Sequence, residues 1–313
     1  MQGYIIRRLI ATIPVVMVVM LFTFTLLRIA PGDPAALIAG VEATEEQIEA
    51  IRDSLGLNKP LHLQLFIFFR DSLIGDFGDS ITSGKPVLEL VIKRLVPTLS
   101  LAFLSEALAV LLAVPMGVLA AWRANTWIDR SVMAFSTIGF SIPLFFLGFL
   151  MIIGFGVKLQ WFPVAGYVAP TEDFTAFLHR LIMPAFATGI VIMALIARMT
   201  RASMLEILRE DYIRTARAKG LAEKMVLVRH ALKNAALPII TVIGLGVAGL
   251  MSGLVVTESV FAIPGVGRLV VDAMVRRDYP VIQGAIVLIS TTYVIVNLLV
   301  DLSYAYFDPR IRY

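Results

Sequence analysis

Six apolar blocks separated by polar segments run through the chain. They cover residues 9–27, 95–122, 131–157, 181–197, 234–257 and 279–300. A helix rises about 1.5 Å per residue, so blocks of about twenty residues cross a hydrocarbon core of about 30 Å. The pattern therefore predicts an all-α, polytopic membrane protein with six transmembrane helices. Pro14, Pro115, Pro143 and Pro184 lie within or near the starts of these blocks, where we expect helix kinks.

The segment between the first two blocks has a different, mixed character. Thr44 and Gln47 have the spacing of a capping box, apolar positions follow at helical spacing, and Gly56 ends the pattern. Residues 61–74 predict a second amphipathic helix. We interpret 31–97 as an insert packed on the spans, because it is too short for a large core, with an independent binding domain as the alternative. The predicted division is 1–30, 31–97 and a core of 98–313 containing a charged loop, 198–236.

That loop contains the longest charged segment between two apolar blocks, residues 210–238. Asp211 is predicted to cap a helix over 212–219, and Gly220 to end it in a left-handed conformation. A second helix is predicted over 222–236, until Pro238. On charge alone, a solvated loop between spans is an equal alternative, but the helix–glycine–helix pattern favours a folded unit that a partner protein grips.

The distribution of basic residues predicts the orientation. The chain is 58% hydrophobic, with a mean hydropathy of +0.86. If the N-terminus is inside, the inner segments hold 15 lysines and arginines, and the outer segments 31–97, 158–180 and 258–278 hold 11 over far more residues. The positive-inside rule then places both termini and the 198–236 loop in the cytoplasm.

Several classes of chemistry are excluded. There is no cysteine, the three histidines have no metal-ligand spacing, and no basic tract with interleaved aromatics suggests nucleic acid. No nucleotide-binding or catalytic motif is present, so we expect a non-enzymatic chain without a metal site or cofactor of its own. If ATP drives this protein, the nucleotide must bind another chain.

Acids and glycines inside the spans are the remaining candidates for function. Glu106 lies about one-third along its block; lining a translocation path and fixing helix packing are equal interpretations. Glu258 and Asp301 lie near interfaces, where a structural role is favoured. Gly249 and Gly253 form a small-xxx-small pair that favours close packing, with a place beside a moving pathway as the alternative.

Two stretches resemble a known loop. Residues 212–221 (YIRTARAKGL) and 229–235 (RHALKNA) are similar to the "EAA" loop of ABC-importer permeases, and more narrowly to the B-type subunit of the dipeptide/oligopeptide/nickel family. Arg214-Thr215-Ala216 stands where other importers carry Glu-Ala-Ala, a departure that the peptide-type subfamily shares. Further similar stretches are Pro31-Gly32-Asp33-Pro34, Leu55-Gly56-Leu57, Gly75-Asp76-Phe77-Gly78, 261–269, 277–280 and 308–313.

The resemblance implies a type I ABC-importer permease fold in the bacterial inner membrane. It implies a second homologous permease subunit, two cytosolic ATPase subunits that bind ATP and Mg²⁺, and a periplasmic solute-binding protein. Arg214 and Arg217 would offer charged contacts to the ATPase, and Ile213 and Ala216 a small apolar face. The implied coupling residues are Asp211, Tyr212, Ile213, Arg214, Thr215, Ala216, Arg217, Gly220 and Leu221.

We expect two further sets of functional residues. The translocation path would include Glu106, Gly249, Gly253 and Glu258, and the binding protein would contact Arg276, Arg277 and Asp278. The alternatives are a stand-alone ion-coupled transporter or channel, which would favour inverted repeats and several deep acids, and a membrane scaffold or receptor. The residues do not select among peptides, glutathione, nickel and other small solutes as substrate.

Overall fold

The computed structural model describes residues 2–29, 33–39, 43–54 and 56–307. In these ranges the chain is helical and has no strand; one isolated antiparallel bridge joins Asp79 to Pro86. The chain forms two compact units. One comprises residues 2–96 and 265–298, and the other comprises residues 97–264 with the end of the chain from Leu299.

The 2–96/265–298 unit is built from one whole long helix, parts of two others and several short helices. It contains α1 (Gln2–Ile29), α2 (Pro34–Ala39), α3 (Glu45–Ser54), α4 (Leu61–Ile74), the start of α5 (Val87–Trp122), α12 (Val266–Arg276) and most of α13 (Tyr279–Phe307). The predicted capping box is confirmed: the Thr44 amide donates to Gln47 Oε1 at 3.0 Å, and the Gln47 amide to Thr44 Oγ1 at 3.4 Å. Gly56 follows with a φ of +66°.

The core of this unit joins α5, α12 and α13. Its buried residues are Val87, Val91, Val266, Ala273, Val281, Ile282 and Ala285. A Cβ on Gly284 would lie 2.5 Å from Val87 Cγ1, so glycine lets the two long helices approach closely. In the insert, Arg52 pairs with Asp33, and this hydrogen bond holds the pKa of Asp33 below its usual range.

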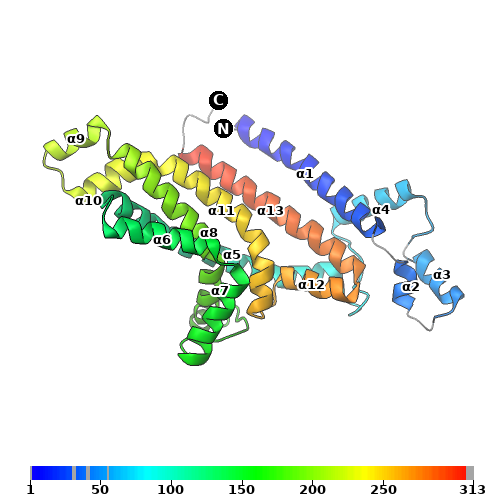
Figure 1. Ribbon diagram of the computed structural model, residues 1–313. Helices are drawn as coiled ribbons and strands as arrows, with labels where there is room; N and C mark the ends of the chain where they lie inside the picture. The colour runs from blue at the N-terminus through cyan, green and yellow to red at the C-terminus, as the bar shows by residue number, and fades with distance from the viewer. Residues whose placement is uncertain (1, 30–32, 40–42, 55, 308–313) are drawn as a thin grey trace. The chain divides into compact units, whose positions relative to one another are not determined.

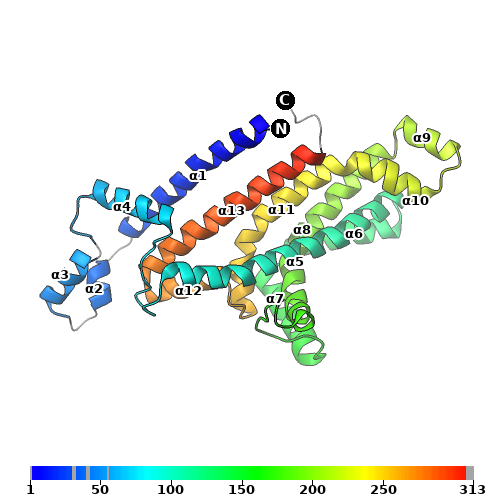
Figure 2. The ribbon, with the colours of Figure 1, turned by 180° about the vertical axis from the view of Figure 1, so that it is seen from behind.

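The 97–264 unit contains the rest of α5 and the helices that follow it. These are α6 (Trp127–Ser141), α7 (Leu144–Met151), the π-helical η1 (Ile152–Lys158), α8 (Phe174–Ile207), α9 (Asp211–Ala218), α10 (Glu223–Met225), the π-helical η2 (Val226–Leu232) and α11 (Lys233–Val260). Helix α8 packs against α6, α7 and α11 (Figure 1). Both views place α9 and α10 at the end of α8 and α11 that is far from α7 (Figure 2).

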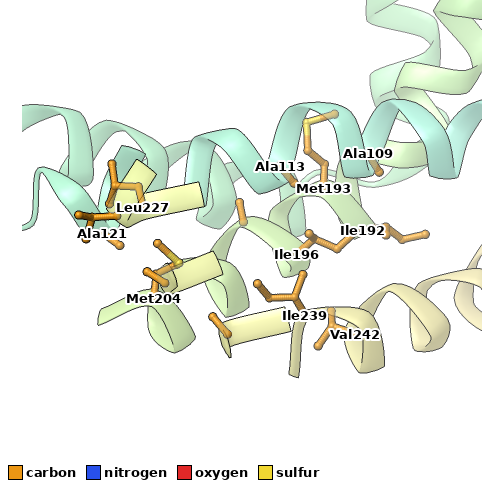
Figure 3. Packing of buried hydrophobic residues seen from close by; sticks show 14 of the residues in the cluster. Ala109, Ala113, Ala121, Ile192, Met193, Ile196, Met204, Leu227, Ile239 and Val242 are labelled. Atoms are coloured by element: carbon orange, nitrogen blue, oxygen red, sulfur yellow. The ribbon is translucent and has the colours of Figure 1, made fainter. Parts of the chain in front are cut away.

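Small and branched side chains form the core of this unit. Ala109 and Ala113 on α5 face Met193 on α8, and Ile239 on α11 belongs to the same cluster (Figure 3). A Cβ on Gly189 would lie 2.8 Å from the Ser105 carbonyl oxygen, so α5 and α8 approach almost backbone to backbone. Close approach through small residues is typical of helices that pack in a membrane.

Among the described residues, five helices are long and apolar enough to cross a membrane, or six if one bent pair counts as a span. The pair is Trp127–Ser141 with Leu144–Lys158, and the chain bends by 107° between them. The pattern predicts a single span over residues 131–157. The structure has two helices with a sharp bend between them instead. The break falls at Ile142-Pro143, since proline disfavours helical backbone in the residue before it.

Some expectations fall outside the described residues. These are the Pro31-Gly32 half of one similar stretch, Leu55 of another, the 308–313 stretch, and the side chain of Asp301.

Candidate functional site

Helix α9 is a single short helix with defined ends. Its N-cap residue is Glu210, and no side chain caps the first turn. The prediction that Asp211 caps the helix is therefore wrong: Asp211 is its first residue, and its carboxylate pairs with Arg214 one turn later. No side chain caps α9, but a charged pair at i,i+3 also stabilises an exposed helix.

The C-terminus of α9 is a Schellman motif. The Gly220 amide donates to the Arg217 carbonyl at 2.9 Å, and the Leu221 amide to the Ala216 carbonyl at 3.4 Å. Gly220 has a φ of +77°, which confirms the predicted left-handed stop. Arg217 also donates to Glu223 Oε1 at 2.7 Å, so the turn between α9 and α10 is closed by a side-chain bridge. Side-chain pairs therefore stabilise both ends of α9: Asp211 with Arg214 at the start, and Arg217 with Glu223 at the end.

One face of α9 is anchored to its own unit. Ile213 is fully buried and Ala216 nearly so, in the cluster that holds Met204, Val226 and Leu227. The expectation that Ile213 and Ala216 offer an apolar face to a partner is therefore wrong. Their side chains fix α9 to the ends of α8 and η2, because burying apolar surface is what holds so short a helix in place.

The opposite face of α9 and the turn after it are exposed. This face mixes an aromatic ring, branched and flexible apolar groups, and positive charge, the composition that protein interfaces favour. The exposed residues of α9 and of this turn include Asp211, Tyr212, Arg214, Thr215, Arg217, Lys219 and Leu221. Met225, the last residue of α10, and Val228, on η2, are further exposed apolar residues that sequence reasoning missed.

The second helix of the loop does not end at Pro238. Helical backbone continues from Glu223 through η2 and α11 to Val260, and Pro238 lies inside α11. Proline removes one backbone donor but does not stop a helix in this setting. As a result, the segment that follows α9 is mechanically continuous with the span after it.

A buried ion pair, also missed from the sequence, joins α6 to α8. Arg201 donates to both carboxylate oxygens of Asp129, with Nη2 to Oδ2 at 2.7 Å, and the Asn125 amide donates to Oδ2 at 2.9 Å. Asp129 is buried. Arg201 lies on the last two turns of α8, so the clamp holds the helix that leads into α9. The only sequence signal was one acid between Arg123 and Arg130.

The two glutamates of the predicted path differ in their surroundings. Glu258 is fully buried and accepts a hydrogen bond from Thr98 at 2.6 Å, which fits a structural role. Glu106 lies on α5 with both carboxylate oxygens buried and without a hydrogen-bond partner. A Cβ on Gly246 of α11 would lie 3.3 Å from Glu106 Oε1, so glycine makes room for the carboxylate.

Gly249 and Gly253 also differ. A Cβ on Gly253 would lie 3.2 Å from Leu144 Cδ2, which fits close packing against α7. A Cβ on Gly249 would meet nothing within 4 Å. The structure brings Glu106 and Gly246 together, and Gly249 lies one turn further along α11 beside open space.

The predicted binding-protein residues lie at the end of α12. Arg276 and Arg277 are exposed, and Arg277 has a left-handed backbone with a φ of +56°. Asp278 is 3% exposed and accepts from the Ser80 hydroxyl at 2.6 Å and from the Ile81 and Thr82 amides. Its carboxylate organises the 80–83 turn and is not presented to a partner.

Folded in this way, the chain is a polytopic helical membrane protein with an anchored, surface-presented helix between two spans. The model of the "Binding-protein-dependent transport system inner membrane component" family matches residues 113–313, and that of its N-terminal part matches residues 1–102. The chain belongs to this family and is a multi-pass inner-membrane component of an ABC transport complex.

Similar proteins align over the full length. A probable peptide ABC transporter permease of Sinorhizobium fredii is 51% identical over 313 residues, covering 100% of both chains. The glutathione transport system permease of Escherichia coli K12 is 42% identical, and the dipeptide transport system permease of Alkalihalophilus pseudofirmus 38% identical, each over 100% of both chains. A solved chain of the MetNI methionine ABC transporter has a TM-score of 0.59 at 20% identity, covering 71% of this chain and 97% of that one.

Proposed function

We propose that the chain forms half of the translocation path of an ATP-driven importer for di- or oligopeptides or a related small solute. A second homologous permease would form the other half, two cytosolic ATPase subunits would bind ATP and Mg²⁺, and a periplasmic binding protein would deliver the substrate. Both termini and α9 would face the cytoplasm. The names of the similar permeases support a peptide or glutathione-like substrate.

The observation that carries the mechanism is the construction of α9. Ile213 and Ala216 fix its inner face to the unit, and its outer face stays exposed. The same chain segment continues without a helix break from Glu223 into α11. When the ATPase pair closes on the outer face, the displacement therefore passes into a span and does not dissipate in a loop.

The exposed ring of Tyr212 and side chain of Leu221 test this docking. Tyr212→Ala with Leu221→Ala is expected to lower ATP-driven uptake about tenfold or more, since truncating interface anchors typically costs about 2 kcal/mol each. Uptake is measured in proteoliposomes that contain the complete complex, with co-purification of the ATPase as second readout. Tyr212→Phe keeps the ring and is the matched control.

Two results would contradict the proposal. One is wild-type uptake and ATPase retention in the double variant. The other is substrate uptake by the chain alone, driven by a sodium or proton gradient without ATP, which is the behaviour of a secondary transporter.

A further inference from the structure

The carboxylate of Glu106 differs from the other buried carboxylates of its unit because it has no hydrogen-bond partner. Glu258 accepts from Thr98, and Asp129 is held by Arg201 and a backbone amide. In the described part of the chain, Glu106 is the acid whose two side-chain oxygens are both buried and unpartnered. Burying a carboxyl without a hydrogen-bond partner is unfavourable, so a packing role alone does not explain it.

Helix α11 covers this carboxylate. A Cβ placed on Gly246 would lie 3.3 Å from Oε1, 3.4 Å from Oε2 and 2.8 Å from Ile192 Cγ2. Any larger residue at position 246 would displace the Glu106 carboxylate or the Ile192 side chain of α8. Gly246 therefore allows α11 to close over Glu106, and a small shift of α11 would uncover it.

The covering helix is the one that α9 drives. Helical backbone runs from Glu223 to Val260, and the α9–α10 turn is bridged by Arg217 and Glu223. A movement of α9 would therefore be transmitted along this helix toward Gly246. One turn beyond it, Gly249 borders open space, which leaves room for α11 to shift. The exposure of Glu106 is expected to alternate with the transport cycle.

We propose that Glu106 is a cation site of the translocation path, and that it binds the ammonium group of the substrate when α11 has moved away. This inference rests on the proposed function. The covered carboxylate argues for a transient occupant, because a fixed lysine or arginine of the second permease would need permanent access. A charge-assisted hydrogen bond in a water-poor site is strong, and peptides carry the required ammonium at their amino terminus.

A series at position 106 separates charge from packing. The probes are trialanine and glutathione, each with one ammonium group, in ATP-driven uptake by the complete complex. We expect Glu106→Gln to lower uptake about tenfold or more, Glu106→Lys to abolish it, and Glu106→Asp to retain more than Gln. Glutamine nearly preserves the shape and aspartate preserves the charge. The inference is overturned if the Glu106→Gln complex retains as much uptake as the Glu106→Asp complex. This holds also if both variants lose uptake equally.

The matched control is Glu89→Gln, an exposed glutamate of the same helix that pairs with Lys93. It is expected to leave uptake unchanged. A wild-type complex that hydrolyses ATP but imports neither probe would instead refute the peptide substrate of the proposed function, and the inference with it. The two failures are therefore distinguishable.

Accessibility tests the transient occupant directly. The chain has no cysteine, so Glu106→Cys gives a single target for a cationic methanethiosulfonate reagent. Labelling is compared between the nucleotide-free complex and the complex trapped with ATP and vanadate. We expect a several-fold difference in labelling rate between the two states. Equal rates would overturn the gated site and favour a permanent partner from the second permease.

Discussion

Arg277 adopts a left-handed conformation that costs a residue with a Cβ about 1–2 kcal/mol. It ends α12 in a Schellman motif, in which the Asp278 amide donates to the Ala273 carbonyl at 2.9 Å. Glycine is the usual residue at this position. An exposed arginine held in strained backbone supports a functional reason for its side chain, and contact with the binding protein is the proposed one.

The substitution Arg277→Gly separates the backbone from the side chain. We expect it to raise the thermal stability of the complex slightly, by about 1 kcal/mol, because the strain is relieved. It should also weaken stimulation of ATP hydrolysis by the binding protein. Both are measured on the same purified complex, by thermal unfolding and by ATPase titration.

Asn125→Gly is the control for Arg277→Gly. Asn125 also has a positive φ, +64°, and lies before α6. Its replacement relieves a smaller backbone strain, because asparagine tolerates the left-handed region better than arginine, and it removes no charge, so stimulation should stay at the wild-type level. Full stimulation of the Arg277→Gly complex would show that the arginine makes no productive contact.

At the scale of elements, the Asp129–Arg201 clamp sets how firmly α8 carries α9. The two guanidinium nitrogens and the Asn125 amide satisfy the buried carboxylate, so its burial is compensated. The bidentate geometry also fixes the orientation of α8 against the start of α6. We expect the clamp to keep the two helices moving together.

Breaking one side of this clamp should be worse than removing both. Asp129→Asn leaves the partly buried Arg201 without its counter-charge and is expected to destabilise the complex by about 2 kcal/mol. Adding Arg201→Gln should restore part of that loss. Thermal unfolding of the single and double variants gives the coupling energy.

The exposed pair Glu89–Lys93 on α5 is the control for this cycle, since surface ion pairs contribute little. Its double replacement by glutamine should leave stability unchanged. Additive losses for Asp129 and Arg201 would indicate that the clamp is not a unit.

Local signals account for the elements that the sequence predicts correctly. The capping box of α3, the glycine at position 56 and the left-handed Gly220 each act through bonds within a few residues, so their patterns are readable without the fold. Long apolar runs were equally informative, because hydrocarbon imposes their length.

Two errors were local, the cap at Asp211 and the break at Ile142-Pro143. The others concern interactions between separate elements. Ile213 and Ala216 are anchors only because η2 returns beneath them, and no local pattern shows this. Helical backbone passes through Pro238, since its neighbours compensate for the missing donor. The Asp129–Arg201 pair joins residues 72 positions apart. Such contacts decide which residues of α9 are buried and which are exposed, and the sequence pattern of 211–221 does not show this.

For the whole molecule, the bent pair Trp127–Ser141 and Leu144–Lys158 decides the topology. If the pair crosses the bilayer, the chain makes six crossings and both termini share one side. If the pair enters and leaves on the same face, five crossings put the termini on opposite sides. The positive-inside rule favours six, because it needs the segment around Arg123 inside and the segment before α8 outside.

Single cysteines on either side of this pair test the count, since the natural chain has none. Arg123 and Glu172 are exposed and flank the pair, while Asn58 and Lys219 serve as the outer and inner references. We expect a membrane-impermeant maleimide to label Asn58→Cys and Glu172→Cys in spheroplasts, and Arg123→Cys and Lys219→Cys only after permeabilisation. If positions 123 and 172 react from the same side, the pair is re-entrant. The cytoplasmic placement of α9 would then depend on the Lys219→Cys result alone. Labelling of this cysteine from outside would exclude docking of a cytosolic ATPase at α9.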